Sequence, residues 1–398
     1  MKIFIVIQNM NMGGVQRALK SFCEELVKRN VEIELCILEN KENALLISEI
    51  PKEIKIKFVP KLSSRICLIM NTNKKNVFCK YGVGGIFFKL IFGLLWKMNC
   101  EKLVALLLFN KVYKEINADV MCTYDGKPFL PDAFVRNYGG NIRKIAWLHN
   151  DYSIFKINKA KTIRLYYSFD KILCVSKNVL NSFLKVCSDI NEKALVLKNC
   201  YSVDNILKKS FEQSPFEQNG KFKFLTVCRM YNQSKRIDRL LQAIRFVVDS
   251  GKDNFEFYLV GDGPDLQTSI QLSIDLEISR YCHFEGRKEN PYPYYRNADV
   301  FVLSSDYEGA PIVVDEALIC GTPVISTDFE SIFEQVEDGD NGIIVDKTPE
   351  ALGKAMILVM SNVELLKRIN NNAKKYISSN QKSVTTFLQL ISENRLID

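Results

Sequence analysis

Two acidic residues, Glu308 and Glu316, bracket a short loop between an apolar run and an apolar helical stretch in DVFVLSSDYEGAPIVVDEALICGTPVIST. The first amide groups of a helix have no partner inside it and can hold phosphate or sugar oxygens. Pro311 suits the first turn, because the N–H group that it lacks would have been unpaired there. The loop is therefore expected to bind an anionic or hydroxylated ligand through backbone N–H groups. The candidate donors are Gly309, Ala310 and Ile312.

The two carboxylates are expected to divide the ligand between them. Glu316 lies about one turn into the helix and follows a β-branched run suited to burial, so it is placed to accept hydrogen bonds from both hydroxyls of a ribose, as acidic residues do in other nucleotide sites. Glu308 would face a sugar attached to the nucleotide. The alternative is that Glu308 is a solvated loop residue and Glu316 an ordinary residue of a helix surface.

Two cations, Arg229 and Lys235, follow another apolar run in TVCRMYNQSKRIDRLLQAI. A nucleoside diphosphate that leaves a sugar develops negative charge, which a metal or fixed cations must stabilise. The two side chains supply two charges, and the start of the following helix adds about half a charge. The alternative is a solvated basic loop.

The first half of the chain offers further candidates. Gly13 and Gly14 follow the first strand-like run, where backbone can approach a diphosphate or a sugar, although paired glycines are common in turns. His149 ends another strand-like run and is a candidate general base, whereas the second histidine, His283, is expected to pack.

Metal and dinucleotide chemistry are disfavoured. The pair Asp338 and Asp340 lies in EDGDNG, which is typical of a tight turn, so no metal site is expected. The segment GDGPDL lacks the third glycine of a dinucleotide fingerprint, which argues against a nicotinamide or flavin enzyme. The twelve cysteines show no C-x-x-C spacing and are expected to be reduced core residues.

Apolar runs alternate with helical stretches along most of the 398 residues. This pattern predicts an α/β protein of two Rossmann-like, doubly wound domains, with ligands bound at the carboxyl ends of parallel strands and in a cleft between the halves. The polar stretch 199–220 is expected to join them. The expected domains are 1–205, 206–380 and a final helix at 381–398 that returns to the first domain. The N-terminus indicates a strand and not a signal peptide, so a cytoplasmic protein is expected.

The positive charge is concentrated in one segment. Between Lys52 and Lys114 there are thirteen Lys and Arg residues against two Glu residues, whereas the whole chain carries a net charge of +8. Within it, 85–114 is strongly apolar, but its uncharged runs of at most about eight residues are too short to span a bilayer. A basic apolar helix suits an anionic membrane surface, and the alternative is a core helix with snorkelling lysines. Nucleic-acid binding is not expected, because RNA-stacking motifs are absent.

The chain resembles the GT4 family of retaining glycosyltransferases, which have the GT-B architecture. The similarity is clearest over 222–346, in TVCRMYNQSKR, GDGP, FEG, YRNADVFVLSS and the E-x7-E motif EGAPIVVDE, and it is weaker at GGVQRAL, WLHN, CVSKNVLNSF and LKNCYSVD. The chain departs from the family at Cys228 and Arg236, where Gly is common, and at Gln16, where Glu is frequent. Arg236 adds a third charge beside Lys235.

The resemblance implies a hexosyltransferase that moves a sugar from a nucleotide-diphosphate sugar, more often UDP-sugar than GDP-sugar, with retention and without a metal, cofactor or protein nucleophile. It assigns Arg229 and Lys235 to the diphosphate, Glu316 to the ribose and Glu308 to the donor sugar. Gly13 and Gly14 match the loop that closes over the donor. The membrane-surface hypothesis adds a saccharide acceptor on a polyprenyl diphosphate, in surface polysaccharide synthesis. Two alternatives remain, a nucleotide-sugar epimerase of the same architecture and a non-catalytic partner subunit.

Overall fold

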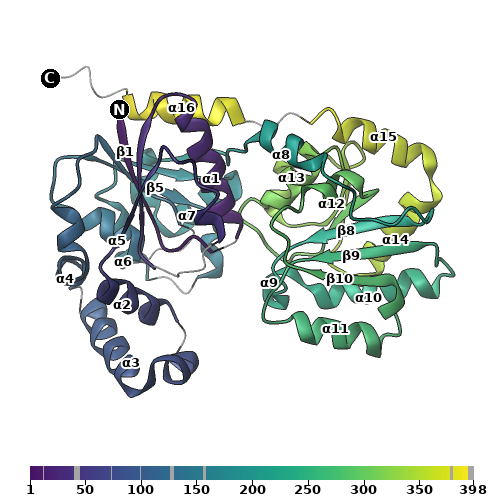
Figure 1. The fold of residues 1–398 in the computed structure, drawn as a ribbon, viewed down its shortest axis with the longest axis horizontal. Coiled ribbons are helices and arrows are strands. Elements are labelled where there is room, and N and C mark those ends of the chain that lie inside the picture. Colours follow the sequence, from purple (N-terminus) through teal and green to yellow (C-terminus); the bar gives the residue numbers. More distant parts are fainter. Residues whose placement is uncertain are drawn as a thin grey trace. The chain divides into compact units, whose positions relative to one another are not determined.

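The computed structural model describes residues 1–11, 13–39, 45–72, 74–98, 100–125, 130–155, 158–376 and 380–392 (Figure 1). The chain divides into two compact units. Unit 1 contains Met1–Cys200 together with the helix α16 (Asn380–Ser392), and unit 2 contains Tyr201–Ser379. Each unit is built around one parallel sheet.

The sheet of unit 1 has the strand order β3-β2-β1-β4-β5-β6-β7, and every neighbouring pair is parallel. Its central strands are buried along nearly their whole length, as expected for a parallel sheet covered on both faces. The strands are β1 (Lys2–Ile7), β2 (Glu32–Ile37), β3 (Lys55–Phe58), β4 (Val120–Thr123), β5 (Arg143–Leu148), β6 (Lys171–Cys174) and β7 (Ala194–Val196).

Eight helices of unit 1 are described. Helix α16 joins this unit at the far end of the sequence, where Phe387 packs against Phe22 and Trp147 with ring centroids 5.0 and 5.6 Å apart. The helices are α1 (Gly14–Val27), α2 (Lys61–Asn71), α3 (Lys74–Lys97), α4 (Glu101–Tyr113), α5 (Leu130–Asn137), α6 (Lys159–Tyr166), α7 (Lys177–Val186) and α16.

The sheet of unit 2 has the order β10-β9-β8-β11-β12-β13 and is also parallel throughout. The order reverses between β8 and β11, which is the switch point where open α/β sheets bind ligands. The strands are β8 (Phe222–Val227), β9 (Phe255–Val260), β10 (Cys282–Gly286), β11 (Val300–Leu303), β12 (Val324–Thr327) and β13 (Gly342–Val345).

The helices of unit 2 pack around that sheet and complete a core that includes Phe224, Leu240 and Leu259. They are α8 (Val203–Ser210), α9 (Asn232–Lys235), α10 (Ile237–Asp249), α11 (Leu266–Asp275), α12 (Tyr292–Asn297), α13 (Ile312–Ile319), α14 (Pro349–Ser361) and α15 (Val363–Ala373). The two Rossmann-like sheets predicted from the sequence are confirmed.

Several elements of unit 2 had not been predicted, among them a helix and a strand near the ends of the expected second domain. The polar stretch 199–220 contains the helix α8, and a sixth strand, β13, follows the EDGDNG segment. That segment forms the predicted tight turn. Gly339 has φ +76°, Asp338 accepts a hydrogen bond from the Ile344 amide at 2.9 Å, and Asp340 accepts one from Asn372 at 2.7 Å. Both carboxylates therefore have local structural partners.

Ten of the twelve cysteines are buried free thiols, as expected. Cys79 on α3 is exposed and Cys100 is partly exposed, which contradicts the expectation for these two. Both lie between Lys52 and Lys114, in the segment where the positive charge is concentrated.

Candidate functional site

The loop that carries Arg229 runs along the loop that follows β9. The amides of Cys228 and Met230 donate to the carbonyl oxygens of Val260 and Asp262 at 3.0 and 3.1 Å. This contact requires glycine in GDGP, because a Cβ on Gly261 would lie 1.8 Å from the Cys228 carbonyl oxygen. The GDGP glycines therefore support the Arg229 loop.

Arg229 and Lys235 differ in their surroundings. Arg229 is exposed and its guanidinium lies 5.7 Å from the centre of the Tyr231 ring, and it forms no ion pair within the described part of the chain. Lys235 forms an ion pair with Glu308, whose Oε1 also accepts a hydrogen bond from Ser305 at 2.8 Å. The sequence had suggested two uncompensated cations. In this structure Arg229 supplies the uncompensated charge, and Lys235 is neutralised by the acid assigned to the sugar.

The loop after β11 is tied to the loop after β8. Ser304 Oγ donates to the carbonyl oxygens of Lys235 and Arg236 at 2.7 and 3.1 Å. The Glu308 carbonyl oxygen accepts from Ser331 Oγ at 2.9 Å. These bonds hold the Glu308 segment before any ligand binds, and preorganised groups of this kind make electrostatic stabilisation effective.

The positive charge of Arg236 is paired with carboxylates. Its guanidinium binds Asp238 and Asp306 at 2.9 and 3.1 Å, so the third charge expected beside Lys235 is compensated. Arg236 also has φ +51°, a left-handed conformation that favours glycine. This conformation explains why glycine suits this position.

The variants Arg236→Gly and Arg236→Ala separate the backbone effect from the ion pairs. Both variants remove the guanidinium. Only alanine, which has a Cβ atom, still pays the free-energy cost of the left-handed backbone conformation. Arg236→Gly is therefore expected to be more stable than Arg236→Ala by about 1 kcal/mol in urea unfolding. Equal stability would show that the φ value places no demand on this residue.

The loop from Gly309 ends at Pro311, the N-cap of α13. Within the described residues, the amides of Ala310 and Ile312 donate no hydrogen bond, as required of ligand donors. Glu316 is only 2% exposed, and its oxygens accept from the hydroxyls of Tyr295 and Tyr292 at 3.1 and 3.3 Å.

The two tyrosines come from α12, which the sequence had not connected with the site. Tyr295 is buried and Tyr292 is partly exposed. A ribose would therefore have to share Glu316 with Tyr292 or displace its long hydrogen bond. The repeated tyrosines in YPYYRN, just before a strand, are the only sequence signal for this role.

Asp315, next to Glu316, has a different set of partners. It accepts hydrogen bonds from Tyr201 and Gln335 at 2.5 Å each, and from Tyr376. Tyr201 is the first residue of unit 2 and Tyr376 lies near its end. Asp315 thus ties both ends of the unit to the helix that carries Glu316, and the sequence gave no indication of this contact.

The remaining candidates lie in unit 1, at the carboxyl ends of β1 and β5. Gly13 is the N-cap of α1, and Gly14 is its first residue. Nearby, Gln8 and Asn71 donate to Glu39, a buried carboxylate, at 2.7 and 2.9 Å. Glu39 thus connects Gln8, directly after β1, with Asn71, the last residue of α2.

His149 is buried beside Tyr124, with the ring centres 4.5 Å apart, and its Nε2 has no partner within the described residues. Burial lowers the pKa of His149 to about 3. The ring is therefore neutral at physiological pH, but it binds a proton too weakly for an effective general base. Its position favours hydrogen bonding to a ligand over proton abstraction.

The low pKa of His149 predicts a pH-dependent stability. Because the pKa is lowered by folding, the unfolded chain binds the proton first as the pH falls below about 6.5, and the folded state loses stability. At pH 5 this effect amounts to about 2 kcal/mol. Urea unfolding at pH 7 and pH 5 should show this loss in the wild type and not in His149→Gln. His283→Gln is the control, and an equal change in that variant would contradict the assignment.

The chain has clear relatives. Residues 208–376 match the family model described as glycosyl transferases group 1. A Campylobacter jejuni α-1,4-N-acetylgalactosaminyltransferase acting on a GalNAc-containing undecaprenyl-diphosphate saccharide is 24% identical over 380 residues, which cover 94% of this chain and 93% of that protein. The α-monoglucosyldiacylglycerol synthase of Acholeplasma laidlawii is 29% identical over 57% of each chain. The chain spans about six tenths of the length of this synthase and of an uncharacterised Methanocaldococcus jannaschii glycosyltransferase, 64% of which it covers.

Solved structures show the same architecture. Anabaena HepE in complex with UDP and glucose has a TM-score of 0.71 at 17% identity, over 99% of this chain and 98% of HepE. A mutant of S. aureus TarM, in complex with fondaparinux, α-GlcNAc-glycerol and UDP, has a TM-score of 0.73 at 14% identity, over 98% and 99% of the two chains. The fold is GT-B.

Proposed function

We propose that this chain transfers a hexose from a nucleotide-diphosphate sugar to a saccharide acceptor, because residues 208–376 match the glycosyl transferases group 1 family model. The observation that carries the proposal is the preorganised Glu308–Ile312 loop, held beside Lys235 at the switch point of the unit 2 sheet. UDP-sugar is the preferred donor class, in keeping with the UDP bound to HepE and TarM in their complexes.

The proposed site divides the donor among its residues. Arg229 and Lys235 bind the diphosphate and stabilise its charge as the bond to the sugar breaks. The amides of Ala310 and Ile312 bind donor oxygens at the start of α13, and Glu316 anchors the ribose. Glu308 faces the sugar and orients Lys235. Transfer proceeds with retention and without a metal, and the leaving phosphate receives the acceptor proton.

Donor binding tests this proposal directly. A thermal-shift screen with UDP-, GDP- and ADP-sugars should stabilise the chain by about 2.7 kcal/mol when the true donor is present at 100 times its Kd. Glu316→Gln should weaken donor binding by about 1.5–3 kcal/mol, because a charge-assisted hydrogen bond is lost. Asp315→Asn is the matched control, since its partners are the residues Tyr201, Gln335 and Tyr376. No shift with any donor would refute the site, and free epimerised sugar without acceptor would favour an epimerase.

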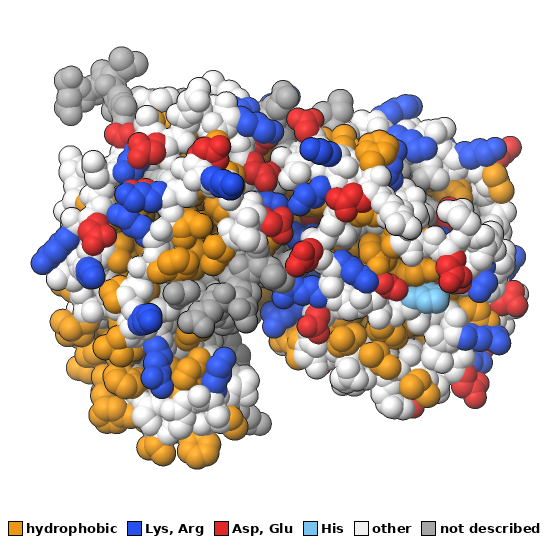
Figure 2. Space-filling view, viewed as in Figure 1, with side chains coloured by type: hydrophobic (Ala, Val, Ile, Leu, Met, Phe, Trp, Pro, Cys, Tyr) orange, Lys and Arg blue, Asp and Glu red, His pale blue; other side chains and the backbone are white. Residues whose placement is uncertain are grey.

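The acceptor is proposed to be lipid-linked, in surface polysaccharide synthesis at the cytoplasmic face of the membrane. Helices α3 and α4 expose many large apolar side chains, which gather on one part of the surface in Figure 2. Exposed lysines flank them, as suits an anionic membrane. This α3–α4 surface consists of Phe78, Val83, Phe87, Phe88, Leu90, Ile91, Leu94, Met98, Leu103, Leu106 and Leu107.

The exposure of these side chains supports the membrane-surface interpretation of the basic apolar segment over that of a core helix. Helix α3 is not a core helix, whereas α4 buries Val104, Leu108 and Val112 and exposes its opposite side. Among the described residues, the helical segment Asn76–Lys97 has the length and the apolar composition needed to cross a membrane. Its backbone breaks at Gly82, where φ is +64° and ψ is −162°. This break favours a helix lying on the membrane surface.

Vesicle flotation tests the α3–α4 surface. The chain should float with phosphatidylglycerol vesicles at low salt, and Phe87→Ser/Leu94→Ser should reduce the floating fraction at least tenfold, because each removed apolar side chain is worth about 1.5–3 kcal/mol of burial. Phe333→Ser/Leu358→Ser, which alters exposed apolar residues of unit 2, is the control. Flotation that is equal for both double variants, or absent for the wild type, would remove the proposal.

A further inference from the structure

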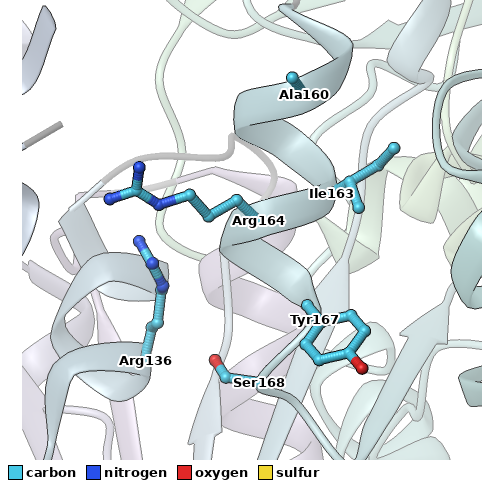
Figure 3. A pocket seen from close by; sticks show the side chains of 6 residues that line it. All are labelled: Arg136, Ala160, Ile163, Arg164, Tyr167 and Ser168. Carbon is cyan, nitrogen blue, oxygen red and sulfur yellow. The ribbon is translucent and has the colours of Figure 1, made fainter.

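We propose that a pocket between α5 and α6 binds a phosphate or diphosphate group carried by a lipid. The pocket has a volume of about 520 Å³ and is formed by residues of unit 1, whereas Arg229, Lys235, Glu308 and Glu316 belong to unit 2. It is lined by Arg136, Ala160, Ile163, Arg164, Tyr167 and Ser168 (Figure 3).

Two guanidinium groups line the pocket, and both contact one carboxylate beside it. Figure 3 shows Arg136, from α5, and Arg164, from α6, extending toward each other. Both reach the same oxygen of the buried Glu101, at 3.9 and 3.3 Å. Two cations thus meet at one carboxylate, and the Arg136 side chain is only 17% exposed.

The surroundings of Arg136 oppose its positive charge. Burial lowers the pKa of Arg136, the charge of Glu101 opposes that change, and the charge of Arg164 lowers the pKa further. An anion between the two guanidinium groups would relieve both burial and repulsion. Arginine forks bind phosphate oxygens in a bidentate manner, and two forks that converge from different helices match the several oxygens of a phosphate or diphosphate.

The other walls indicate that the phosphate belongs to an amphiphile. Ala160 and Ile163 form an apolar wall beside the arginines, and Tyr167 exposes 66% of its surface at the rim. A soluble inorganic anion would make no contact with these apolar and aromatic side chains, whereas the first carbons of a lipid chain would pack on them. Ser168 adds an exposed hydroxyl.

The pocket also adjoins the α3–α4 surface. Lys161 on α6 donates to the carbonyl oxygens of Trp96 and Lys97, the last residues of α3, at 3.1 and 3.3 Å. Glu101 is the first residue of α4. A membrane under the α3–α4 surface would therefore bring phosphate groups to the level of the two arginines.

The phosphate could come from a polyprenyl-diphosphate acceptor or from the headgroup of an anionic lipid. Only the first of these sources rests on the proposed function. Inorganic diphosphate should be titrated calorimetrically into the full chain carrying Arg229→Ala, so that the proposed donor site does not compete. Saturable binding is expected, and Ser168→Glu in that background should weaken it at least tenfold. Lys111→Gln on α4, which changes the net charge equally, should change it less than twofold. Absence of saturable binding, or equal losses in both variants, would overturn the proposal.

Ser168 is exposed, so its replacement should leave the fold intact. The double variant Arg136→Gln/Arg164→Gln is the second test of diphosphate binding. Flotation is then measured with phosphatidylcholine vesicles that contain either polyprenyl diphosphate or phosphatidylglycerol. The lipid on which Ser168→Glu reduces retention of the chain is the source of the phosphate. Unchanged retention on both would overturn the proposal. The thermal shift with UDP-sugar should persist in Ser168→Glu, and its absence from the wild type would instead count against the donor site.

Discussion

Replacing Lys235 by methionine is expected to slow sugar transfer by about 10²–10³-fold, the usual effect of removing one preorganised group that stabilises developing charge. Two effects combine. The diphosphate loses a cation, and Glu308 loses the partner that neutralises it. The measurement is the initial rate of transfer, or of donor hydrolysis until an acceptor is found.

The neighbouring cation provides the matched control. Arg236→Gly also removes one positive charge, but that charge is already taken up by Asp238 and Asp306, so its rate should stay within a few fold of wild type. A comparable loss in both variants would show that general charge, and not the position of Lys235, determines the rate.

The double variant Lys235→Met/Glu308→Gln separates the two roles of Glu308. Removing the unpaired carboxylate should restore part of the donor affinity lost in Lys235→Met, as coupled residues do in a double-mutant cycle. Turnover should stay low, because Glu308 is also proposed to face the sugar. Full recovery of turnover would leave Glu308 as a partner of Lys235 alone.

The second large effect is expected from Gly261→Ala, which should destabilise unit 2 by about 4 kcal/mol or more. The added Cβ would lie 1.8 Å from the Cys228 carbonyl oxygen, and φ at Gly261 is +142°. The clash is with backbone and cannot be relieved by a side-chain rotation. The adjacent bonds Cys228 N–H to Val260 and Gly261 N–H to Gly286, at 3.0 and 2.8 Å, resist separation of the loops.

Gly286→Ala is the control for backbone conformation. Gly286 also has a positive φ, +64°, but nothing lies within 4 Å of its added Cβ, so only about 1 kcal/mol should be lost. Urea unfolding of both variants should show this difference, and donor affinity should fall in Gly261→Ala, because the Arg229 loop moves. Equal midpoints would show that the loops separate freely.

The sequence was a good guide to the elements around the donor site. Apolar runs predicted β8 and β11, and the helical stretches after them predicted α10 and α13. These features depend on local periodicity, which a single chain displays. The helix α8 was missed because it is mostly polar, and β13 because its short run follows a turn-rich segment.

The exposure of the candidate residues could not be predicted in the same way. Glu316 was expected to be buried and to bind a ribose, and the structure confirms the burial but adds hydrogen bonds from Tyr292 and Tyr295. His149 was a candidate base, and burial makes it a very weak one. Both results depend on side chains from other elements, which bury a group or form hydrogen bonds with it. The sequence around the group itself does not show these contacts.

Residue types and spacing were enough to predict two Rossmann-like halves, a binding loop from Glu308 to Glu316, and a basic apolar segment in the first half. The pairing of Lys235 with Glu308, 73 residues apart, arose only in the folded unit, as did the convergence of Arg136 and Arg164 on Glu101. Periodicity and turn chemistry act between near neighbours in the chain. The charge state and accessibility of a site depend on distant residues that meet only when parallel strands align their carboxyl ends and helices pack across them.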